Sequence, residues 1–259
     1  MTNERRVLVH PDMDSLIAAV AARFLTKLTD LLDEYQEVNI ALTGGTAGGQ
    51  GVQQAVAQSP MRGAIDWTRV HFWWGDERFL PKNDPDRNEV QAREALLDLI
   101  PVPPENIHPF PASDEIPDIE QAAAAYADEL RAHADPALRL TVPRFDITFL
   151  GVGPDGHIAS LFPEHDVRLD DERLVVADRN APKPPPERLS LTLPVINSSQ
   201  RIWMVLSGAE KASALGLALA GASPIEVPAA GAQGRRRTVF FVDAEAAEQV
   251  PQNLIASSY

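Results

Sequence analysis

The sequence predicts an α/β fold: a doubly wound, mostly parallel sheet with helices on both faces. Three observations support this prediction, namely short apolar runs of strand length, helical periodicity between them, and glycine-rich turns where some of the runs end. Parallel strands that are covered on both faces carry continuous apolar runs rather than alternating ones. Runs of this kind that alternate with helices therefore indicate one sheet between two helical layers.

The first elements follow the order helix, strand, glycine turn, helix. Apolar residues recur at helical intervals through residues 16–35, and Asp12 or Asp14 is in position to cap the start of this helix. Residues 38–43 are β-compatible and end in a glycine turn, which leads into a helical stretch at residues 50–57.

The same alternation continues to the end of the chain. Helices are predicted at residues 88–100 and 119–133. The remaining predicted strands are residues 69–74, 145–150, 174–177, 189–193, 202–206 and 239–242. Two proline-dense stretches, residues 101–117 and 182–186, are interpreted as loops within a single domain spanning residues 1–259, because strands follow both of them and a cut would leave the sheet incomplete.

Composition and charge exclude several classes of function. The 259 residues include 23 Lys and Arg against 37 Asp and Glu, so the formal charge is −14 and the field repels nucleic acid and anionic lipid. The chain has no Cys, which excludes thiolate metal sites and thiol nucleophiles. No apolar run approaches the roughly 18 residues of a membrane span. We expect a cytoplasmic protein with no nucleic-acid or membrane partner, in which an anionic ligand must meet locally concentrated cations.

The first glycine turn is a candidate phosphate site. Ligands of open α/β sheets bind beyond the carboxyl ends of the strands, so residues at those ends are examined first. Thr43, Gly44, Gly45 and Thr46 place two glycines between hydroxyls just before a helix. Backbone N–H groups and the positive helix end would face an anion there. A tight turn without a ligand is the alternative.

The strand at residues 69–74 is followed by adjacent carboxylates and an arginine. Side chains at neighbouring positions diverge, so Asp76 and Glu77 are not expected to face one ligand together. Arg78 can clamp a phosphate with its planar guanidinium, or it can form a surface salt bridge.

The strand at residues 145–150 runs into a glycine-rich loop that delivers Asp155, Gly156 and His157. The glycine spacing matches a dinucleotide-binding fingerprint. We reject that interpretation because Pro163 follows too soon for a crossover helix and Asp155 would oppose a pyrophosphate. A histidine in a polar loop at a strand end is the best candidate for a group that accepts a proton from water near neutral pH. We predict that His157 is catalytic.

Two cations occur at the ends of other elements. Arg188 opens the strand at residues 189–193, and Lys211 falls in the first turn of a helix that begins near Gly208. A lysine there opposes the helix dipole, which a bound anion would explain; an ordinary solvated lysine is the alternative. No metal site is expected, because the other histidines show no zinc spacing and no HExxH motif occurs. The histidines considered are His71, His108, His133 and His165.

Taken in order, these motifs resemble the 6-phosphogluconolactonases, a family of the pentose phosphate pathway that is related in fold to glucosamine-6-phosphate deaminase. The matching segments are TGGT at 43–46, WWGDERFLP at 73–81, Asp86 with Asn88, FLGVGPDGHIASLFP at 149–163, PKPPPERLSLTLPVIN at 182–197 and GAEKA at 208–212. The string GPDGHxASLFP is the most specific of them. The chain departs from the family pattern at Ala47 and Gly48, where a proline is common, and at Arg87, which makes us expect a more basic local surface.

The resemblance implies hydrolysis of 6-phospho-D-glucono-1,5-lactone to 6-phosphogluconate, without a metal or organic cofactor. His157 would be the general base, and Asp155 or Asp76 would orient the imidazole or the sugar hydroxyls. The expected substrate-binding set is Thr43, Gly44, Gly45, Thr46, Arg78, Gly156, Arg188 and Lys211. The partner would be a small sugar phosphate, and the protein is expected to be a monomer or a weak dimer.

Two alternatives remain at this point. A glucosamine-6-phosphate isomerase/deaminase would read GHIAFNEP where residues 156–163 read GHIASLFP, so this chain lacks the glutamate expected to assist ring opening. A non-catalytic sugar-phosphate sensor, like the effector domains of some bacterial repressors with this fold, would need a DNA-binding module. No basic helix-turn-helix segment is visible in the sequence.

Overall fold

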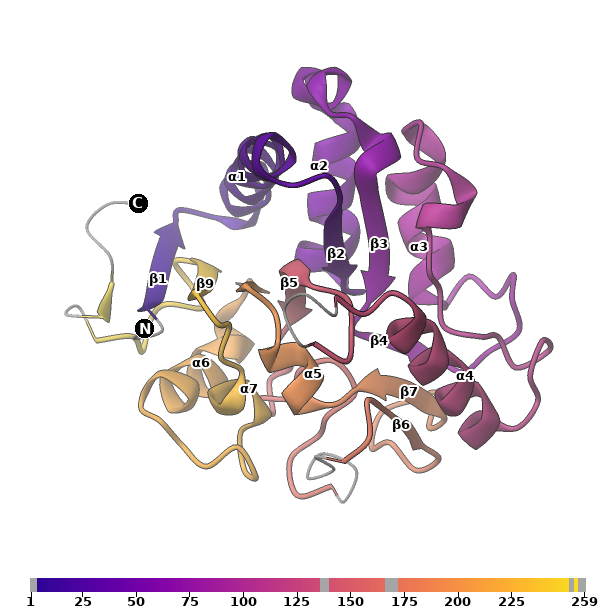
Figure 1. Cartoon of the computed structure of the whole chain (residues 1–259). Coiled ribbons are helices and arrows are strands. Elements are labelled where there is room, and N and C mark those ends of the chain that lie inside the picture. The colour runs from indigo at the N-terminus through magenta and orange to yellow at the C-terminus, as the bar shows by residue number, and fades with distance from the viewer. Residues whose placement is uncertain (1–3, 136–139, 166–171, 252–253, 256–259) are drawn as a thin grey trace.

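A six-stranded sheet, parallel at every pair of neighbouring strands, forms the centre of the molecule (Figure 1). The computed structural model describes residues 4–135, 140–165, 172–251 and 254–255. The strand order is β1-β9-β8-β5-β2-β3. The bounds are β1 (Glu4–His10), β2 (Val38–Leu42), β3 (Val70–Trp74), β5 (Phe145–Gly151), β8 (Arg201–Leu206) and β9 (Arg237–Asp243). The predicted mostly parallel sheet is confirmed.

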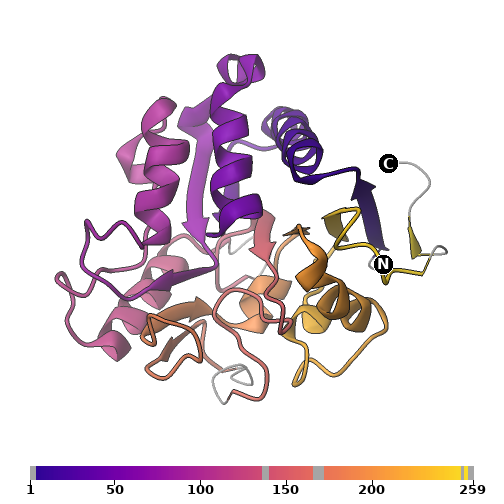
Figure 2. The same ribbon diagram turned by 180° about the vertical axis from the view of Figure 1, so that it is seen from behind.

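Helices cover both faces of this sheet. The helices are α1 (Met13–Glu34), α2 (Val52–Gln58), α3 (Asn88–Ala95), α4 (Ile119–Ala132), α5 (Leu193–Asn197), α6 (Ala212–Leu219) and α7 (Pro228–Gly231). Trp73 and Thr148 both pair in register with Ala41, so they share one face, and Phe149 lies on the other. Phe149 packs edge-on against Phe24 of α1, whereas Trp73 packs edge-on against Tyr126 of α4. Viewed from behind in Figure 2, α2 and α3 stand beside α1 in the same layer.

A second, antiparallel sheet lies beyond the carboxyl ends of the central strands. It consists of β4 (Asp76–Arg78), β7 (Arg188–Leu191) and β6 (Val175–Asp178), in the order β4-β7-β6. The predicted strands at 174–177 and 189–193 therefore exist but belong to this sheet. Its short β4 was not predicted, because three polar residues carry no strand periodicity.

The other predicted elements agree with the structure except at their ends, whereas the short helices α5 and α7 were not predicted. Asp12, not Asp14, caps α1, and its carboxylate accepts the backbone N–H of Ser15 at 2.7 Å. The helix predicted at 50–57 is α2, preceded by a π-helical turn (Thr46–Gly51). The edge strand β1 was not predicted, because its first half is charged and only its second half carries an apolar run. Among the described helices, none combines the length and apolar character that a membrane span requires.

Candidate functional site

A cavity of about 230 Å³ opens where β2, β3 and β5 end. Its wall contains most of the residues that the sequence predicts for the site: Thr43, Gly44, Gly45, Asp76, Arg78, His157, Arg188 and Lys211. Thr46 lines an adjoining hollow of about 300 Å³, which shares Gly44, Gly45 and Lys211 with the first. Asp155 and Gly156 are not among the described residues of the wall, and Asp155 instead contacts the imidazole of His157 at Nδ1. The fold thus gathers five separate segments of the chain at one place.

The loop after β5 folds back on itself, so that His157 lies close to the residues with which the loop begins. Gly153 donates its N–H to the carbonyl of His157 at 2.9 Å, and Gly156 donates to the carbonyl of Gly153 at 2.9 Å. A Cβ on Gly153 would lie 2.0 Å from His157 Nδ1, so only glycine leaves room for the ring. Gly156 has φ +83°, a conformation that favours glycine. Through Arg188 and within the described residues, no helix follows this loop: Val152 and Leu161 each form an isolated bridge with Ile158, which agrees with the rejection of a dinucleotide site.

His157 is held by a carboxylate and faces a lysine. Its Nδ1 donates to Asp155 Oδ1 at 2.5 Å, and Lys183 Nζ lies 3.2 Å from the same nitrogen and 3.3 Å from the Asp155 carboxylate. Partial burial raises the pKa of Asp155, but the hydrogen bond and charge of His157 and the charge of Lys183 outweigh it and hold that pKa well below its usual range. An ionised Asp155 keeps the proton on Nδ1. The lone pair of the neutral ring is then on Nε2.

The aromatic ring of Phe162 supports this arrangement. Phe162 is buried, and its ring centroid lies 4.7 Å from that of His157. The guanidinium carbon of Arg188 lies 5.8 Å from the centroid of the same ring. The imidazole therefore has a fixed neighbour beside it as well as a fixed partner at Nδ1.

Asp76 lines the cavity but is bound to other partners. Its Oδ2 accepts the hydroxyl proton of Ser160 at 2.7 Å, and its carbonyl accepts the Asn88 side-chain N–H at 2.9 Å. Asn88 also lines the cavity, and its Oδ1 is buried without a hydrogen-bond partner among the described residues. A Cβ on Gly44 would lie 2.1 Å from that oxygen, so the first glycine of the turn makes room for Asn88. Of the two predicted carboxylates, Asp155 is the one that contacts the imidazole.

Glu77 points away from the cavity, as the divergence of neighbouring side chains predicts. Its carboxylate accepts the backbone N–H groups of Arg78, Asn88 and Glu89 at 2.7–2.9 Å and so holds the start of α3. Burial raises the pKa of Glu77 to about 7, against the opposing effects of Arg87 and these three donors. Arg87 itself is 1% exposed and pairs with Glu89 at 3.2 Å. The expected basic surface at Arg87 is therefore wrong, because its guanidinium is buried, with Nη1 and Nη2 donating to the carbonyls of Leu80 and Phe110 and to Glu89.

The cavity is locally positive in a strongly acidic chain. Among the described residues of its wall, the cations are Arg78, Lys183, Arg188 and Lys211, against the single carboxylate of Asp76. Arg78 and Arg188 are direct partners across the β4–β7 ladder. Like charges at opposed positions repel, and an anion between them removes that cost. Burial lowers the pKa of Lys211, and the charge of Lys183 acts in the same direction.

Arg188 also holds the proline-rich loop in place. Its Nε donates to the carbonyl of Pro185 at 3.0 Å, and its Nη2 donates to that of Pro184 at 2.9 Å and to that of Lys183 at 3.4 Å. These bonds do not use Nη1. The prediction from sequence considered Arg188 only as a ligand for phosphate and missed Lys183 altogether. A signal was available, because a lysine confined between prolines has a backbone stiff enough to be positioned for a site.

Comparisons with known proteins agree over nearly the whole chain. Residues 11–241 match the family model described as Glucosamine-6-phosphate isomerases/6-phosphogluconolactonase. The 6-phosphogluconolactonase of Streptomyces coelicolor is 47% identical over 256 residues, which is 98% of each chain. That of Mycobacterium tuberculosis is 42% identical over 248 residues, covering 94% of this chain and 97% of the relative. The crystal structure of 6-phosphogluconolactonase from Thermotoga maritima, 28% identical, matches 93% of this chain and 100% of its own with a TM-score of 0.80.

Proposed function

The chain belongs to the glucosamine-6-phosphate isomerase/6-phosphogluconolactonase family, and we propose that it hydrolyses 6-phospho-D-glucono-1,5-lactone to 6-phospho-D-gluconate with His157 as the general base. The family that the motifs predict is thereby confirmed. The enzyme class is that of a 6-phosphogluconolactonase, a lactone-hydrolysing esterase, since relatives up to 47% identical over nearly the full length carry this name.

The proposed reaction begins with water at the cavity side of His157. Nε2 takes a proton from the water as the oxygen attacks the lactone carbonyl carbon, and Asp155 stabilises the imidazolium that forms. Collapse of the tetrahedral intermediate breaks the bond to the ring oxygen, which receives the proton back from Nε2. One water is consumed, the ring opens to the free acid, and the histidine returns to its neutral form.

Positive charge in the cavity wall stabilises the negative charge that develops on the oxygen of the lactone carbonyl. Lys183 is the cation in contact with the His157–Asp155 pair. A fixed cation in a partly enclosed site stabilises an oxyanion more than solvent does, because it need not reorganise during the reaction. We assign Lys183 this role together with that of keeping Asp155 ionised.

The phosphate of the substrate is assigned to the glycine turn and to the other cations of the cavity wall. Gly44, Gly45 and Thr46 form the turn before a helical segment, and Lys211 lies between the cavity and the adjoining hollow. Arg78 and Arg188 add the opposed pair of cations described above. Together the two hollows fall within the roughly 300–1,000 Å³ of typical small-molecule sites.

This chain has an apolar side chain at the position where a glucosamine-6-phosphate deaminase would have its glutamate. In the aligned pattern that glutamate falls at Phe162, which is buried between His157 and Arg188. The described residues of the cavity therefore offer no carboxylate at this position. An ammonia assay with glucosamine 6-phosphate should detect no turnover.

One observation carries the proposal: Asp155 binds His157 at Nδ1, which leaves Nε2 as the base beside a cationic cavity. His157→Ala should lower kcat by about 10²–10⁴ after subtraction of spontaneous lactone hydrolysis. His133→Ala, a partly exposed histidine at the end of α4, is the matched control and should keep wild-type kcat. Near wild-type kcat in a folded His157→Ala enzyme would remove His157 from the mechanism. Because the proposed steps use only side chains and water, activity should also persist in a chelator.

A further inference from the structure

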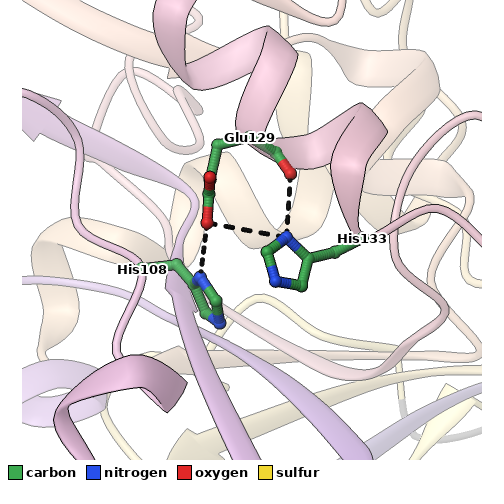
Figure 3. Close-up of side chains that lie close together, drawn as sticks. All are labelled: His108, Glu129 and His133. Carbon is green, nitrogen blue, oxygen red and sulfur yellow. Dashed lines mark hydrogen bonds and ion pairs between the residues drawn. The ribbon is translucent and has the colours of Figure 1, made fainter.

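A second group of titratable side chains lies near the amino end of β3, and the proposed reaction does not use it. Figure 3 shows His108 on one side and Glu129 with His133, from the end of α4, on the other. His108 donates its backbone N–H to the carbonyl of Phe72 in β3 at 2.9 Å. From there to Asp76 is about four residues of extended chain, or roughly 13 Å. The cluster is thus separate from the cavity.

The three side chains are spaced as metal ligands are. Their ligand atoms all lie within 4.8 Å of one another. Glu129 Oε1 is 2.8 Å from His108 Nδ1 and 3.5 Å from His133 Nδ1. Ligands at about 2.0–2.2 Å from a tetrahedral zinc ion are about 3.4 Å apart, so the side chains need to move little to enclose one.

The cluster is held in place on the side of His108 and is exposed to solvent on the side of Glu129 and His133. The His108 ring stacks on Trp73 with centroids 3.9 Å apart, and the Tyr126 hydroxyl donates to the His108 carbonyl at 3.1 Å. Glu129 and His133 are four residues apart on α4, which places them on one face, and their side chains are 43% and 38% exposed. An ion can therefore enter from solvent and keep water in its fourth position.

His133 can turn toward an ion without leaving a buried group unsatisfied. Its Nδ1 contacts the backbone carbonyl of Glu129 at 3.0 Å. That carbonyl already accepts the backbone N–H of His133 at 3.3 Å. The ring nitrogen is therefore available as a ligand at small cost.

A chain of polar contacts lies behind His108. His108 Nε2 lies 3.0 Å from His71 Nδ1, and His71 Nε2 lies 3.7 Å from the carboxylate of Glu37. The separation from Glu37 is longer than a hydrogen bond, so the hydrogen bonds of this chain are those of His108 with His71 and with Glu129.

A metal ion fits this chain of contacts. If it takes the place of the proton between His108 Nδ1 and Glu129, the Nε2–H of His108 donates to His71 and the Nε2–H of His71 points at Glu37. A ligating histidine whose other N–H is held by a further acceptor is the usual arrangement around protein-bound metals.

We propose that His108, Glu129 and His133 bind a divalent transition-metal ion of the zinc type, with His71 orienting His108. Imidazole and carboxylate together suit zinc, cobalt or nickel better than magnesium or calcium, which prefer oxygen ligands alone. The bound ion ties the end of α4 to the segment beside β3. The sequence did not predict it because His108 is distant in the chain from Glu129 and His133, and only the fold brings them together.

The test is a titration of chelator-treated, full-length protein with Zn²⁺ and with Co²⁺, followed by calorimetry, melting temperature and the visible spectrum of bound Co²⁺. We expect one ion per chain at this site and, at a zinc concentration about 100 times Kd, a rise in Tm of about 5–10 °C. Mg²⁺ should produce no such rise. Absence of Zn²⁺ binding, or equal stabilisation by Mg²⁺, would overturn the proposal.

Zn²⁺ binding by substituted proteins tests whether the ion lies at these three residues. His133→Gln and Glu129→Gln remove partly exposed ligands and should each weaken Zn²⁺ binding at least about 10-fold, as should His71→Gln through its support of His108. Glu120→Gln, the same substitution elsewhere on α4, is the matched control and should bind Zn²⁺ as wild type does. His157→Ala should also keep this binding. Loss of binding in His157→Ala, or undiminished binding in both ligand variants, would place the ion elsewhere and refute the assignment.

Discussion

Replacing Lys183 by methionine separates the electrostatic role of this lysine from any contribution to stability. Its Nζ lies 3.3 Å from the Asp155 carboxylate, a separation at which two unit charges attract by about 1–5 kcal/mol for effective dielectric constants of 80 to 20. The two side chains are 40% and 35% exposed, so solvent screens this attraction strongly. Exposed pairs of this kind contribute about 0.2–1 kcal/mol to stability. We therefore expect Tm to fall by no more than about 2–4 °C.

The expected effect on the reaction is larger. Loss of a hydrogen bond to a charged group costs about 1.5–3 kcal/mol, which corresponds to roughly a 10–150-fold decrease in kcat/KM. Lys183→Met is chosen because methionine keeps much of the apolar length of the side chain. The assay is lactone hydrolysis with freshly generated substrate, corrected for spontaneous opening.

Lys82→Met is the matched control for this experiment. Lys82 also pairs with a carboxylate, Glu115, and its side chain is 58% exposed, but it does not line the cavity. It should keep wild-type kcat/KM. Unchanged kcat/KM in Lys183→Met, or an equal loss in Lys82→Met, would show that the position of Lys183 beside His157 has no catalytic consequence.

Three further predictions follow from the same contacts. Gly153→Ala should displace the imidazole of His157 and lower kcat by about 10² or more in a folded protein, whereas Gly63→Ala, where a Cβ meets nothing within 4 Å, should have wild-type kcat. Glu77→Ala should reduce the free energy of unfolding in urea by about 3–5 kcal/mol, since it leaves three backbone donors without their acceptor and removes one of the two carboxylates beside the buried Arg87; a loss below about 1 kcal/mol would contradict this. The folded-state pKa of Asp155 is depressed, so its ionised form stabilises the fold above about pH 4 and this contribution disappears as the pH falls further. The Tm difference between wild type and Asp155→Asn should accordingly narrow below about pH 4, and a constant difference would disprove the linkage.

Several of the sequence predictions remain predictions. They are the single domain spanning residues 1–259, the cytoplasmic location, the monomer or weak dimer, and the absence of a nucleic-acid partner. The catalytic and substrate-binding roles of all the predicted site residues also belong here. Thr46 lines the adjoining hollow, and Gly156 lies in the loop that carries His157.

Local chemistry was enough to predict most of the strands, the long helices and the loop that presents His157. Strand β5 is apolar at Phe145, Ile147, Phe149 and Leu150, α1 repeats its apolar residues at helical spacing, and the glycines of residues 151–156 predict a tight turn. Each of these features depends on neighbours in the chain, so the pattern of residues carries the information directly.

Tertiary structure decided which of the candidate groups meet. The sequence offered Asp155 and Asp76 as partners for His157, and only the fold shows that Asp76 is bound to Ser160 and Asn88. It also buries Arg87 and brings Lys183 to the pair of His157 and Asp155. Encounters between side chains far apart in the chain depend on how strands and loops cross in space, which periodicity and composition do not encode. The amino-acid pattern alone therefore determined the elements and the chemistry available at their ends, while the packing of those elements selected the partners.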